Sequence, residues 1–430
     1  MNAACDHCLA PSRSIDAPVY GGKYGRLFPD LQPLELDAET LLALGREGGL
    51  CDGSPLAADD GADDARGAAG WPFFGQFVAH DITADRSPVQ LHAEIEELRN
   101  FRTPRANLES VYGAGPVGSP FLYDLDDPAK LLTDRHDVPR NLQGVALVGD
   151  PRNDVHVFIA QLHLAFLRLH NLVVDRLRED CVGEDELFEE ARRATTWHYQ
   201  WVIVEDFLPR VVGSELQREL ASEGSRWFRP DGEAFIPLEF ADAGYRYGHS
   251  QIRHSYRLND RSGALPVLPD LVGFRPIEPE NAIDWSYLFD LPDRPAQQPA
   301  KRIDGRLPAS LIRLPTAISG DVETDLHSLA VRDLDRGLAV GLPSGEVVAE
   351  LFGEEPVDTG LNGSGTPLWL YVLRESDALA EGERLGPVGS RIVGEVLLGL
   401  IDADPGSYRA VDPSWRPTLP GAATSVRCSR

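Results

Sequence analysis

Trp71-Pro72-Phe73-Phe74-Gly75-Gln76-Phe77-Val78-Ala79-His80-Asp81-Ile82-Thr83 decides the fold, because it sets a histidine and a carboxylate inside an apolar, aromatic segment with helical spacing. Side chains at three- and four-residue spacings predict one buried helical stripe: Phe73, Phe74, Phe77, Val78 and Ile82. Gln76 lies four residues before His80 and shares its face, whereas the adjacent Asp81 points elsewhere. Because buried polar groups need partners, His80 is either a core histidine satisfied by a neighbour or part of a functional site.

The composition is that of an ordinary soluble globular enzyme. Of the 430 residues, 42% are hydrophobic and 25% are charged, and the formal net charge of -27 argues against nucleic acid or an anionic membrane as a partner. No run of about 18 apolar residues is present, so no membrane-spanning helix is expected. The start of the chain has no basic region followed by an apolar one, and the five scattered cysteines do not form a paired zinc pattern. These features predict a reduced, cytoplasmic protein.

The segment 102–113 carries oxygen-bearing residues at a spacing that suits a hard cation. Thr103, Asn107 and Glu109 alternate with other residues, and Arg105 would add only its backbone carbonyl. A calcium ion takes roughly six to eight oxygen ligands, and these residues could supply several of them if Asp81 joined. An ordinary capped turn is the alternative interpretation.

Two further segments place polar residues at structured positions. Residues 149–154 begin a helix, with Arg152 where a guanidinium can project into a cavity. Apolar residues then recur at helical spacing as far as residue 177, and His163 and His170 within that helix are interpreted as structural. Further on, His249 follows a glycine, two tyrosines and an arginine. Helices are also expected over 38–46, 92–100, 184–211, 326–338 and 388–401, and irregular loop over 259–300.

Six short motifs together resemble the animal-type haem peroxidase family, the superfamily of myeloperoxidase and the cyclooxygenases, in its bacterial branch. They are Gly75-Gln76-x-x-x-His80-Asp81, Thr103 followed by Val111-Tyr112-Gly113, Gly149-Asp150-x-Arg152, His170-Asn171, Tyr245-Arg246-Tyr247-Gly248-His249 and Arg332-Asp333-Leu334-x-Arg336-Gly337. Each motif alone is common. Their shared order and spacing over residues 70–420 argue against chance and favour a functional role for His80.

This resemblance implies a mainly α fold, a single large helical domain with long irregular loops and little strand. Residues 1–70 are expected to form a loop-rich N-terminal arm, 71–421 the haem peroxidase catalytic domain and 422–430 a C-terminal tail. The implied cofactors are haem b and Ca²⁺. The calcium ligands would be Asp81, Thr103, Arg105, Asn107 and Glu109.

The resemblance also implies a role for each site residue. His249 would be the proximal ligand of the haem iron, and Arg246 would pair with a haem propionate. His80 would move the proton of hydrogen peroxide, because an ordinary histidine pKa of about 6.5 suits both acid and base. Arg152 would stabilise charge on the departing oxygen, and Gln76 would order water or halide. The implied partners are hydrogen peroxide and a small-molecule reductant, either an organic compound or a halide.

Three departures from the family pattern modify these expectations. Asp333 stands where relatives place asparagine against the proximal histidine, so the iron ligand should gain imidazolate character. Asn107 and Glu109 replace the usual Asp and Ser or Asp of the calcium loop, which keeps oxygen ligands. Ala79 and Val155 occupy the positions where mammalian members esterify haem, so the haem b is expected to be non-covalent.

Three classes of function follow from the resemblance. The first is a haem-dependent peroxidase, the second an oxygenase related to fatty-acid dioxygenases, and the third a non-catalytic haem-binding domain. The oxygenases abstract hydrogen with a tyrosine three residues before the proximal histidine. This chain has Arg246 there, with Tyr245 and Tyr247 each displaced by one, which favours the peroxidase. The complete set of two histidines and an arginine argues against a non-catalytic domain.

Overall fold

The computed structural model describes residues 22–54, 63–84, 99–230, 232–319, 325–361 and 365–419. The longer helices are α2 (Ala38–Gly45), α3 (Trp71–Ile82), α6 (Val157–Glu179), α7 (Leu187–Val202), α9 (Ser214–Glu223), α13 (Leu329–Ala339), α14 (Gly345–Phe352), α15 (Leu368–Ala380) and α16 (Pro387–Ala403). The strands are β1 (Gly22–Gly25), β2 (Asp64–Ala68), β3 (Arg99–Asn100), β4 (Phe235–Pro237), β5 (Ser255–Tyr256), β6 (Leu265–Pro266) and β7 (Pro299–Lys301). The predicted mainly α class with little strand is therefore confirmed.

Shorter helical turns connect these elements. The short α-helices are α4 (Glu109–Tyr112), α5 (Gly115–Gly118), α8 (Leu208–Val212), α10 (Leu238–Ala241), α11 (Ala309–Ile312), α12 (Thr316–Ser319) and α17 (Tyr408–Val411). The 3-10 turns are η3 (Pro120–Leu122), η4 (Pro151–Asp154), η6 (Gly244–Gln251), η7 (Pro279–Asn281), η8 (Trp285–Tyr287) and η9 (Asp325–His327). A π-helical turn, η5 (Ile203–Phe207), joins α7 to α8. The second long helix predicted from the sequence thus runs as α7, η5 and α8.

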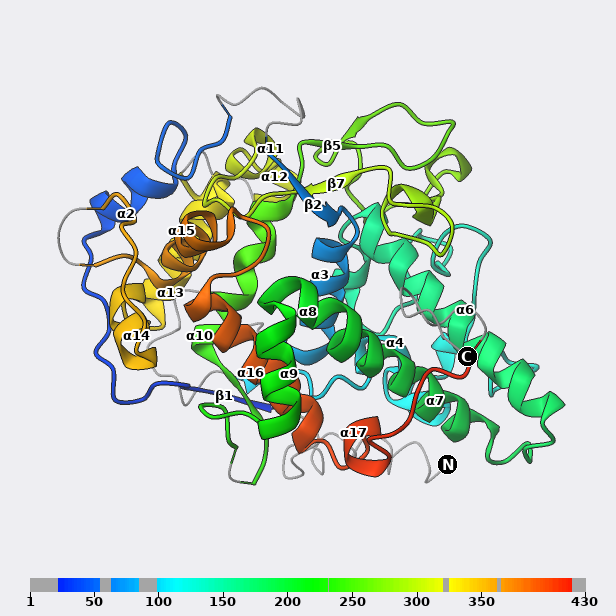
Figure 1. Cartoon of the computed structure of the whole chain (residues 1–430). Coiled ribbons are helices and arrows are strands. Elements are labelled where there is room, and N and C mark those ends of the chain that lie inside the picture. Colours follow the sequence, from blue (N-terminus) through cyan, green and yellow to red (C-terminus); the bar gives the residue numbers. More distant parts are fainter. Residues whose placement is uncertain are drawn as a thin grey trace, which may run out of the picture.

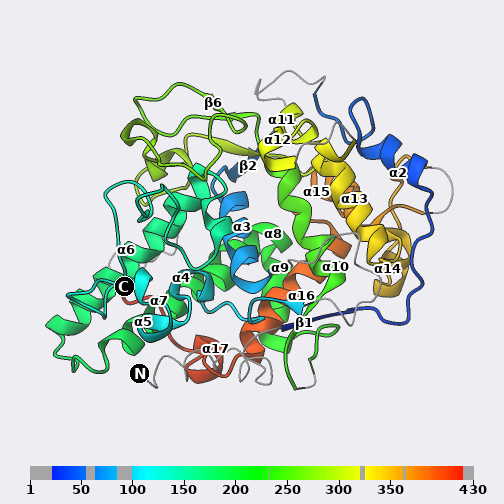
Figure 2. The same cartoon turned by 180° about the vertical axis from the view of Figure 1, so that it is seen from behind.

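Helix α3 lies in the middle of the molecule. Figures 1 and 2 show it surrounded from both sides, with α6 and α7 toward one end and α13, α14 and α15 toward the other. It contacts α6, η6, η4 and α4. The segments that carry Gln76, His80, Arg152, Arg246 and His249 therefore lie on this helix or in contact with it.

Stacked aromatic rings join α3 to α6. Phe73 stacks on Phe158 with ring centroids 4.0 Å apart, and Phe77 stacks on Phe166 at 4.7 Å. Ring pairs of this kind contribute roughly 0.5–1.5 kcal/mol each beyond the burial of apolar area. The stripe predicted for α3 is buried as expected, and its stacked rings fix α3 against the first turns of α6.

Short strands attach the N-terminal segment to the rest of the chain. β1 pairs with β4 in parallel and with β3 in antiparallel order, and β2 pairs with β7. The buried Glu239 carboxylate accepts the backbone N–H of Leu27 at 2.8 Å and of Phe28 at 3.3 Å. The described part of the predicted arm therefore packs against the helical body.

Two expectations about helices need revision or comment. The helix predicted over 92–100 lies outside the described residues except for Arg99–Asn100, where the prediction is wrong because these residues form β3. Asn100 pairs with β1, and its side chain bonds the Ala84 N–H and the Ile82 carbonyl at the end of α3. Although no spanning helix was expected, α6 is long and apolar enough to cross a membrane by length and composition, but 72% of that window is buried inside the protein.

Candidate active site

One cavity of about 420 Å³ brings together the catalytic side chains predicted from the sequence. Those that line it are Gln76 and His80 from α3, Arg152 from η4, and Arg246 and His249 from η6. More than 160 residues separate α3 from η6 in the chain. Motifs that lie far apart in the sequence therefore meet in a single cavity.

A chain of side-chain hydrogen bonds fixes the tautomer of His80. The Asn153 amide nitrogen donates to Nδ1 of His163 at 3.0 Å, which turns its amide oxygen toward Nδ1 of His80 at 2.9 Å. Nδ1 of His80 then carries the proton, because an amide oxygen only accepts. Nε2 of His80 is left as an unprotonated acceptor.

The surroundings of His80 also keep its imidazole neutral. The ring is buried, and burial is the main reason that the His80 pKa falls to about 3, with the nearby Arg152 cation lowering it further. A neutral imidazole with its Nε2 lone pair free can take a proton from a ligand in the cavity. His80 is therefore prepared to act as a base.

Arg152 is held rigidly beside this base. Its Nε donates to Oδ1 of Asp150 at 3.0 Å, and its Nη2 donates to Asp150 Oδ2 at 2.8 Å and to the His80 carbonyl at 2.9 Å. Burial alone would raise the pKa of Asp150, but the Arg152 and Arg102 guanidiniums outweigh it and hold that pKa below its ordinary value. Asp150 is thus an anion that orients the cation at the cavity.

A second histidine, not predicted from the sequence, orients Gln76. Nδ1 of His156 accepts the Ile159 N–H as the N-cap of α6 at 3.4 Å, so its Nε2 carries the proton. That Nε2 donates to Oε1 of Gln76 at 2.8 Å. With the oxygen occupied, the Gln76 amide N–H groups are the part available to a ligand. Burial lowers the pKa of His156 to about 3, so this arrangement does not depend on pH near neutrality.

His249 is bound to a buried carboxylate instead of an amide. Its Nδ1 lies 2.6 Å from Oδ2 of Asp333, which is fully buried on α13. Arg246 donates to the other oxygen of Asp333 at 3.1 Å and also to Asp242 at 3.3 Å. Nε2 of His249 is thereby left for the cavity. Asp333 thus contacts His249, as the sequence predicts, and Arg246 shares its charge.

A smaller polar cavity of about 110 Å³ adjoins the first. Three arginines line it, Arg152, Arg246 and Arg336, together with Asp242, which accepts from Nε of Arg336 at 2.7 Å. Arg152 and Arg246 line both cavities. Anionic groups of a ligand in the large cavity would find these cations at its edge.

The positions expected to be free of ester bonds are apolar and face the large cavity. Ala79 and Val155 both line it. The neighbouring carboxylates are engaged elsewhere. Asp154 accepts both terminal nitrogens of Arg140 at 2.6 and 2.7 Å, and Asp81 accepts two backbone N–H groups.

The predicted calcium ligands lie behind α3, away from the cavity. Asp81 is fully buried and accepts the N–H groups of Leu108 at 2.9 Å and Ser110 at 3.2 Å, which brings it to the loop that holds Thr103, Asn107 and Glu109. The side chain of Arg105 reaches Asp404 at 3.7 Å. Within the described ranges, no three His, Cys, Asp or Glu side chains gather as a metal cluster.

The residues missed at this site are those that orient others. No local pattern singles out Asn153, His156 or Arg102 in the sequence, and His163 was interpreted as structural. Their partners are 10 to 80 residues away, beyond the reach of local spacing. Asn153 lies beside Arg152 in η4, and His156 is the N-cap of α6. A histidine at a helix N-cap close to the Arg152 motif was therefore the signal available in the sequence.

Comparisons with known proteins identify the family of this chain. A model of the animal haem peroxidase family matches residues 90–359. Chorion peroxidase of Drosophila melanogaster is 25% identical over 290 residues, covering 64% of this chain and 33% of that protein. A human protein named probable oxidoreductase PXDNL is 29% identical over 177 residues, covering 40% of this chain and 12% of that protein. The chain thus spans a third or less of the length of these two curated relatives.

Solved structures share the fold over nearly the whole chain. Peroxidase A of Dictyostelium discoideum superposes with a TM-score of 0.68 at 15% identity, covering 93% of this chain and 91% of that one. A fatty acid alpha-dioxygenase of Arabidopsis thaliana superposes with a TM-score of 0.61 at 13% identity, covering 88% and 72%. At these identities the likeness concerns the fold alone.

Proposed function

This chain belongs to the animal haem peroxidase family, and from that premise we propose that it is a haem-dependent peroxidase that uses hydrogen peroxide to oxidise small organic substrates or halides. One observation carries the proposal: a single cavity is lined by a neutral His80, a fixed Arg152 and a carboxylate-backed His249. A peroxidase needs an iron ligand, a base and a cation in one space, and this chain provides all three.

The residues present fit haem. A mostly apolar cavity with an imidazole nitrogen from His249 suits a flat macrocycle with a central iron, and the adjoining cavity with its three arginines suits two propionates. Arg246 already pairs with Asp242 and Asp333 in the protein, so we assign it a shared role between the propionates and the proximal carboxylate. The bound haem supplies the redox-active iron.

The chain's own residues would handle the proton and the charge of peroxide. His80 Nε2 accepts the proton of the bound peroxide oxygen and passes it to the departing oxygen. Arg152, already oriented by Asp150, stabilises the negative charge that develops there. Gln76, with its carbonyl occupied by His156, offers N–H groups to water, to a halide or to the substrate.

We further propose that the haem is haem b held without ester bonds. Ala79 and Val155 cannot form them, and Asp154 and Asp81 are engaged by other groups. Acid–organic extraction followed by mass spectrometry of the polypeptide tests this. Free, unmodified haem in the organic phase is expected, and haem mass remaining on the chain would contradict it. The bacterial branch and the cytoplasmic location stay predictions from the sequence.

A steady-state assay tests the function. The haem-loaded protein is supplied with hydrogen peroxide and a panel of phenols, bromide and iodide, and with a fatty acid under oxygen. Peroxide-dependent oxidation of a phenol or halide is expected. The Arg152→Ala variant is the control and should have much less of this activity. The alternative, an oxygenase, rests on Tyr245, whose ring lines the cavity. Fatty-acid-dependent oxygen uptake without peroxide turnover would favour the oxygenase.

A further inference from the structure

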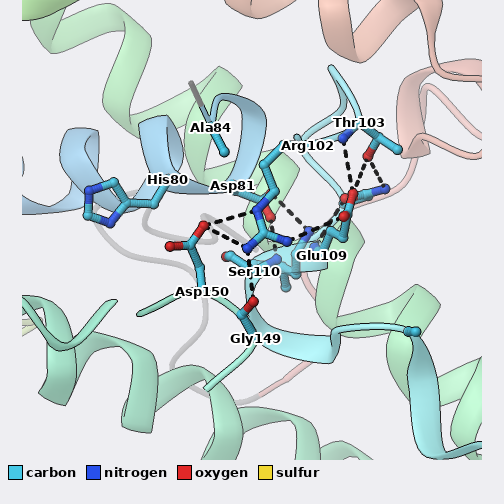
Figure 3. Close-up of polar contacts among 12 residues, drawn as sticks. His80, Asp81, Ala84, Arg102, Thr103, Glu109, Ser110, Gly149 and Asp150 are labelled. Carbon is cyan, nitrogen blue, oxygen red and sulfur yellow. Dashed lines mark hydrogen bonds and ion pairs between the residues drawn. The ribbon is translucent and has the colours of Figure 1, made fainter. Parts of the chain in front are cut away.

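Arg102 lies among three carboxylates behind the active site, of which Asp81 and Asp150 are buried and Glu109 is partly exposed. Its side chain is 7% exposed. Figure 3 shows its guanidinium between Asp150 and Glu109, with Asp81 close by. Nη2 donates to Asp150 at 2.6 Å and to the Gly149 carbonyl at 2.9 Å, Nε donates to Asp150 at 3.0 Å, and Nη1 reaches Glu109 at 3.3 Å.

The side chains expected to bind calcium are occupied by donors from the protein itself. Glu109 Oε2 accepts both the N–H and the hydroxyl of Thr103, at 3.1 and 2.8 Å, while its Oε1 faces Arg102. The Asn107 amide donates to the Thr103 hydroxyl at 3.1 Å, and its oxygen accepts the Glu109 N–H at 3.1 Å. Both oxygens of Asp81 accept backbone N–H groups.

These contacts do not fit a calcium site as it was predicted. A calcium ion needs several oxygens turned toward one point, whereas the side-chain oxygens of Asp81, Asn107 and Glu109 turn toward N–H donors, the Thr103 hydroxyl or a guanidinium. Buried carboxylates still require a positive partner, because an unpaired buried charge is strongly destabilising. Arg102 is a cation already in contact with the buried Asp150 and the partly exposed Glu109.

The same guanidinium is joined to the active site through one shared residue. Asp150 Oδ2 accepts from Arg102 and from Nη2 of Arg152, and Asp150 Oδ1 accepts the backbone and Nε of Arg152. Asp150 is buried, so its position depends on these two guanidiniums. A displacement of Arg102 would therefore be transmitted to Arg152.

We propose that Arg102 is the cation of this loop, in the place where calcium was predicted, and that it positions Arg152 through Asp150. The second half of this proposal rests on the proposed peroxidase function. The first half concerns only how the loop is held, so the two can fail separately.

The calcium dependence of the unaltered protein tests the first half. Haem-loaded protein is gel-filtered in calcium-free buffer, its calcium is measured by plasma mass spectrometry, and its thermal unfolding is compared in millimolar EGTA and millimolar calcium chloride. Calcium far below one ion per chain and an unchanged Tm are expected. Stoichiometric calcium, or a Tm that falls in EGTA, would overturn the proposal whether or not the protein turns over peroxide.

Removing the guanidinium tests both halves. Arg102→Ser leaves Glu109 without its cation and Asp150 with Arg152 alone. We therefore expect a lower Tm and a peroxide reaction about tenfold or more slower, the size of loss found when a group that orients a metal ligand is removed. Millimolar calcium should partly restore both in this variant and have no effect on the parent. Arg176→Ser is the matched control, since Arg176 lies on the surface of α6 with its side chain 62% exposed.

Calcium rescue separates a cation's role from general damage to the fold. A Tm and peroxide rate equal to those of the parent would refute the proposal, as would a loss that calcium does not change. If Arg102→Ser does not give soluble protein, Arg102→Lys replaces it. Lysine keeps the positive charge but cannot form the paired hydrogen bonds of the guanidinium with Asp150. Haem should therefore stay bound while the peroxide reaction slows. A rate equal to that of the parent would count against the positioning role.

Discussion

The two cavity histidines differ in the group that binds Nδ1. His80 meets the neutral amide of Asn153 at 2.9 Å, whereas His249 meets the carboxylate of Asp333 at 2.6 Å. The first contact selects a tautomer and leaves Nε2 as the acceptor atom of a neutral imidazole. The second pulls on a proton, so the imidazole becomes a stronger electron donor to a metal. One residue type is thus given two tasks by its partner alone.

The comparison also shows how each partner is itself held. Asn153 is oriented by the neutral His163, while Asp333 is shared with the cation Arg246 at 3.1 Å. Arg246 takes part of the carboxylate charge, so the imidazolate character of His249 is weaker than the sequence alone predicts. The properties of each histidine therefore depend on a third residue that contacts its partner, His163 for His80 and Arg246 for His249.

Substituting the histidines themselves should break the comparison most completely. We expect His249→Ala to lose haem or its five-coordinate histidine spectrum. The other histidines that line the described cavity, His80 and His156, do not come from η6 and cannot take the place of His249. Haem content and absorption spectra measure this. His80→Phe serves as the control and should keep haem. A His249→Ala protein with full haem content and an unchanged spectrum would contradict the assignment.

The next largest effect is expected on the rate of reaction with peroxide. His80→Ala removes the base and should slow stopped-flow formation of the oxidised protein by roughly 10²–10⁴-fold while leaving haem bound. The rate should not be restored by raising pH, because no base remains to be deprotonated. A rate equal to that of the parent would show that another group moves the proton.

Exchanging the partner of His80 should move the pH dependence. In the parent, burial holds the His80 pKa at about 3, so the peroxide reaction should weaken only as pH falls toward that value. Asn153→Asp places a carboxylate at Nδ1 and stabilises the imidazolium, which raises the pKa. The rate should then fall at a higher pH, since protonated His80 cannot accept a proton. An unshifted pH profile would remove Asn153 from this role.

Exchanging the partner of His249 should give the smallest change. Asp333→Asn keeps a hydrogen-bond acceptor but removes the charge, so the ferric/ferrous potential should rise. We expect a shift on the order of 60 mV at most, which is a tenfold change in equilibrium constant for a one-electron couple. The shift is limited because Arg246 already shares the carboxylate charge. Spectroelectrochemical titration measures it, and a potential that stays constant or falls would contradict the assigned contact.

Local sequence spacing predicted the fold well where helices bury a continuous stripe. The apolar periodicity of residues 157–177 predicted α6, and the aromatic stretch predicted α3 to within one residue at its end. The helix expected over 92–100 is wrong at Arg99–Asn100, because pairing with β1, a contact with a distant segment, decides the conformation there.

The candidate site divides in the same way. The roles of His80, Arg152 and His249 were implied by the resemblance of short motifs to a family, and the structure brings the three side chains to one cavity. His156 and Arg102 were missed because their roles depend on partners brought close only by folding, Gln76 in one case and Asp150 in the other. The calcium ion that the sequence predicts for this loop is the cation that our proposal replaces with Arg102.

Gly149 allows the turn that carries Asp150 to lie directly against the loop that carries Glu109. A Cβ atom on this residue would lie 2.5 Å from the Ser110 carbonyl oxygen, closer than such atoms approach each other. The loop carrying Glu109 and the turn carrying Asp150 therefore touch backbone to backbone. A side chain at position 149 would therefore require the backbone around Ser110 to move. We expect substitutions at position 149 to occur together with changes in this loop.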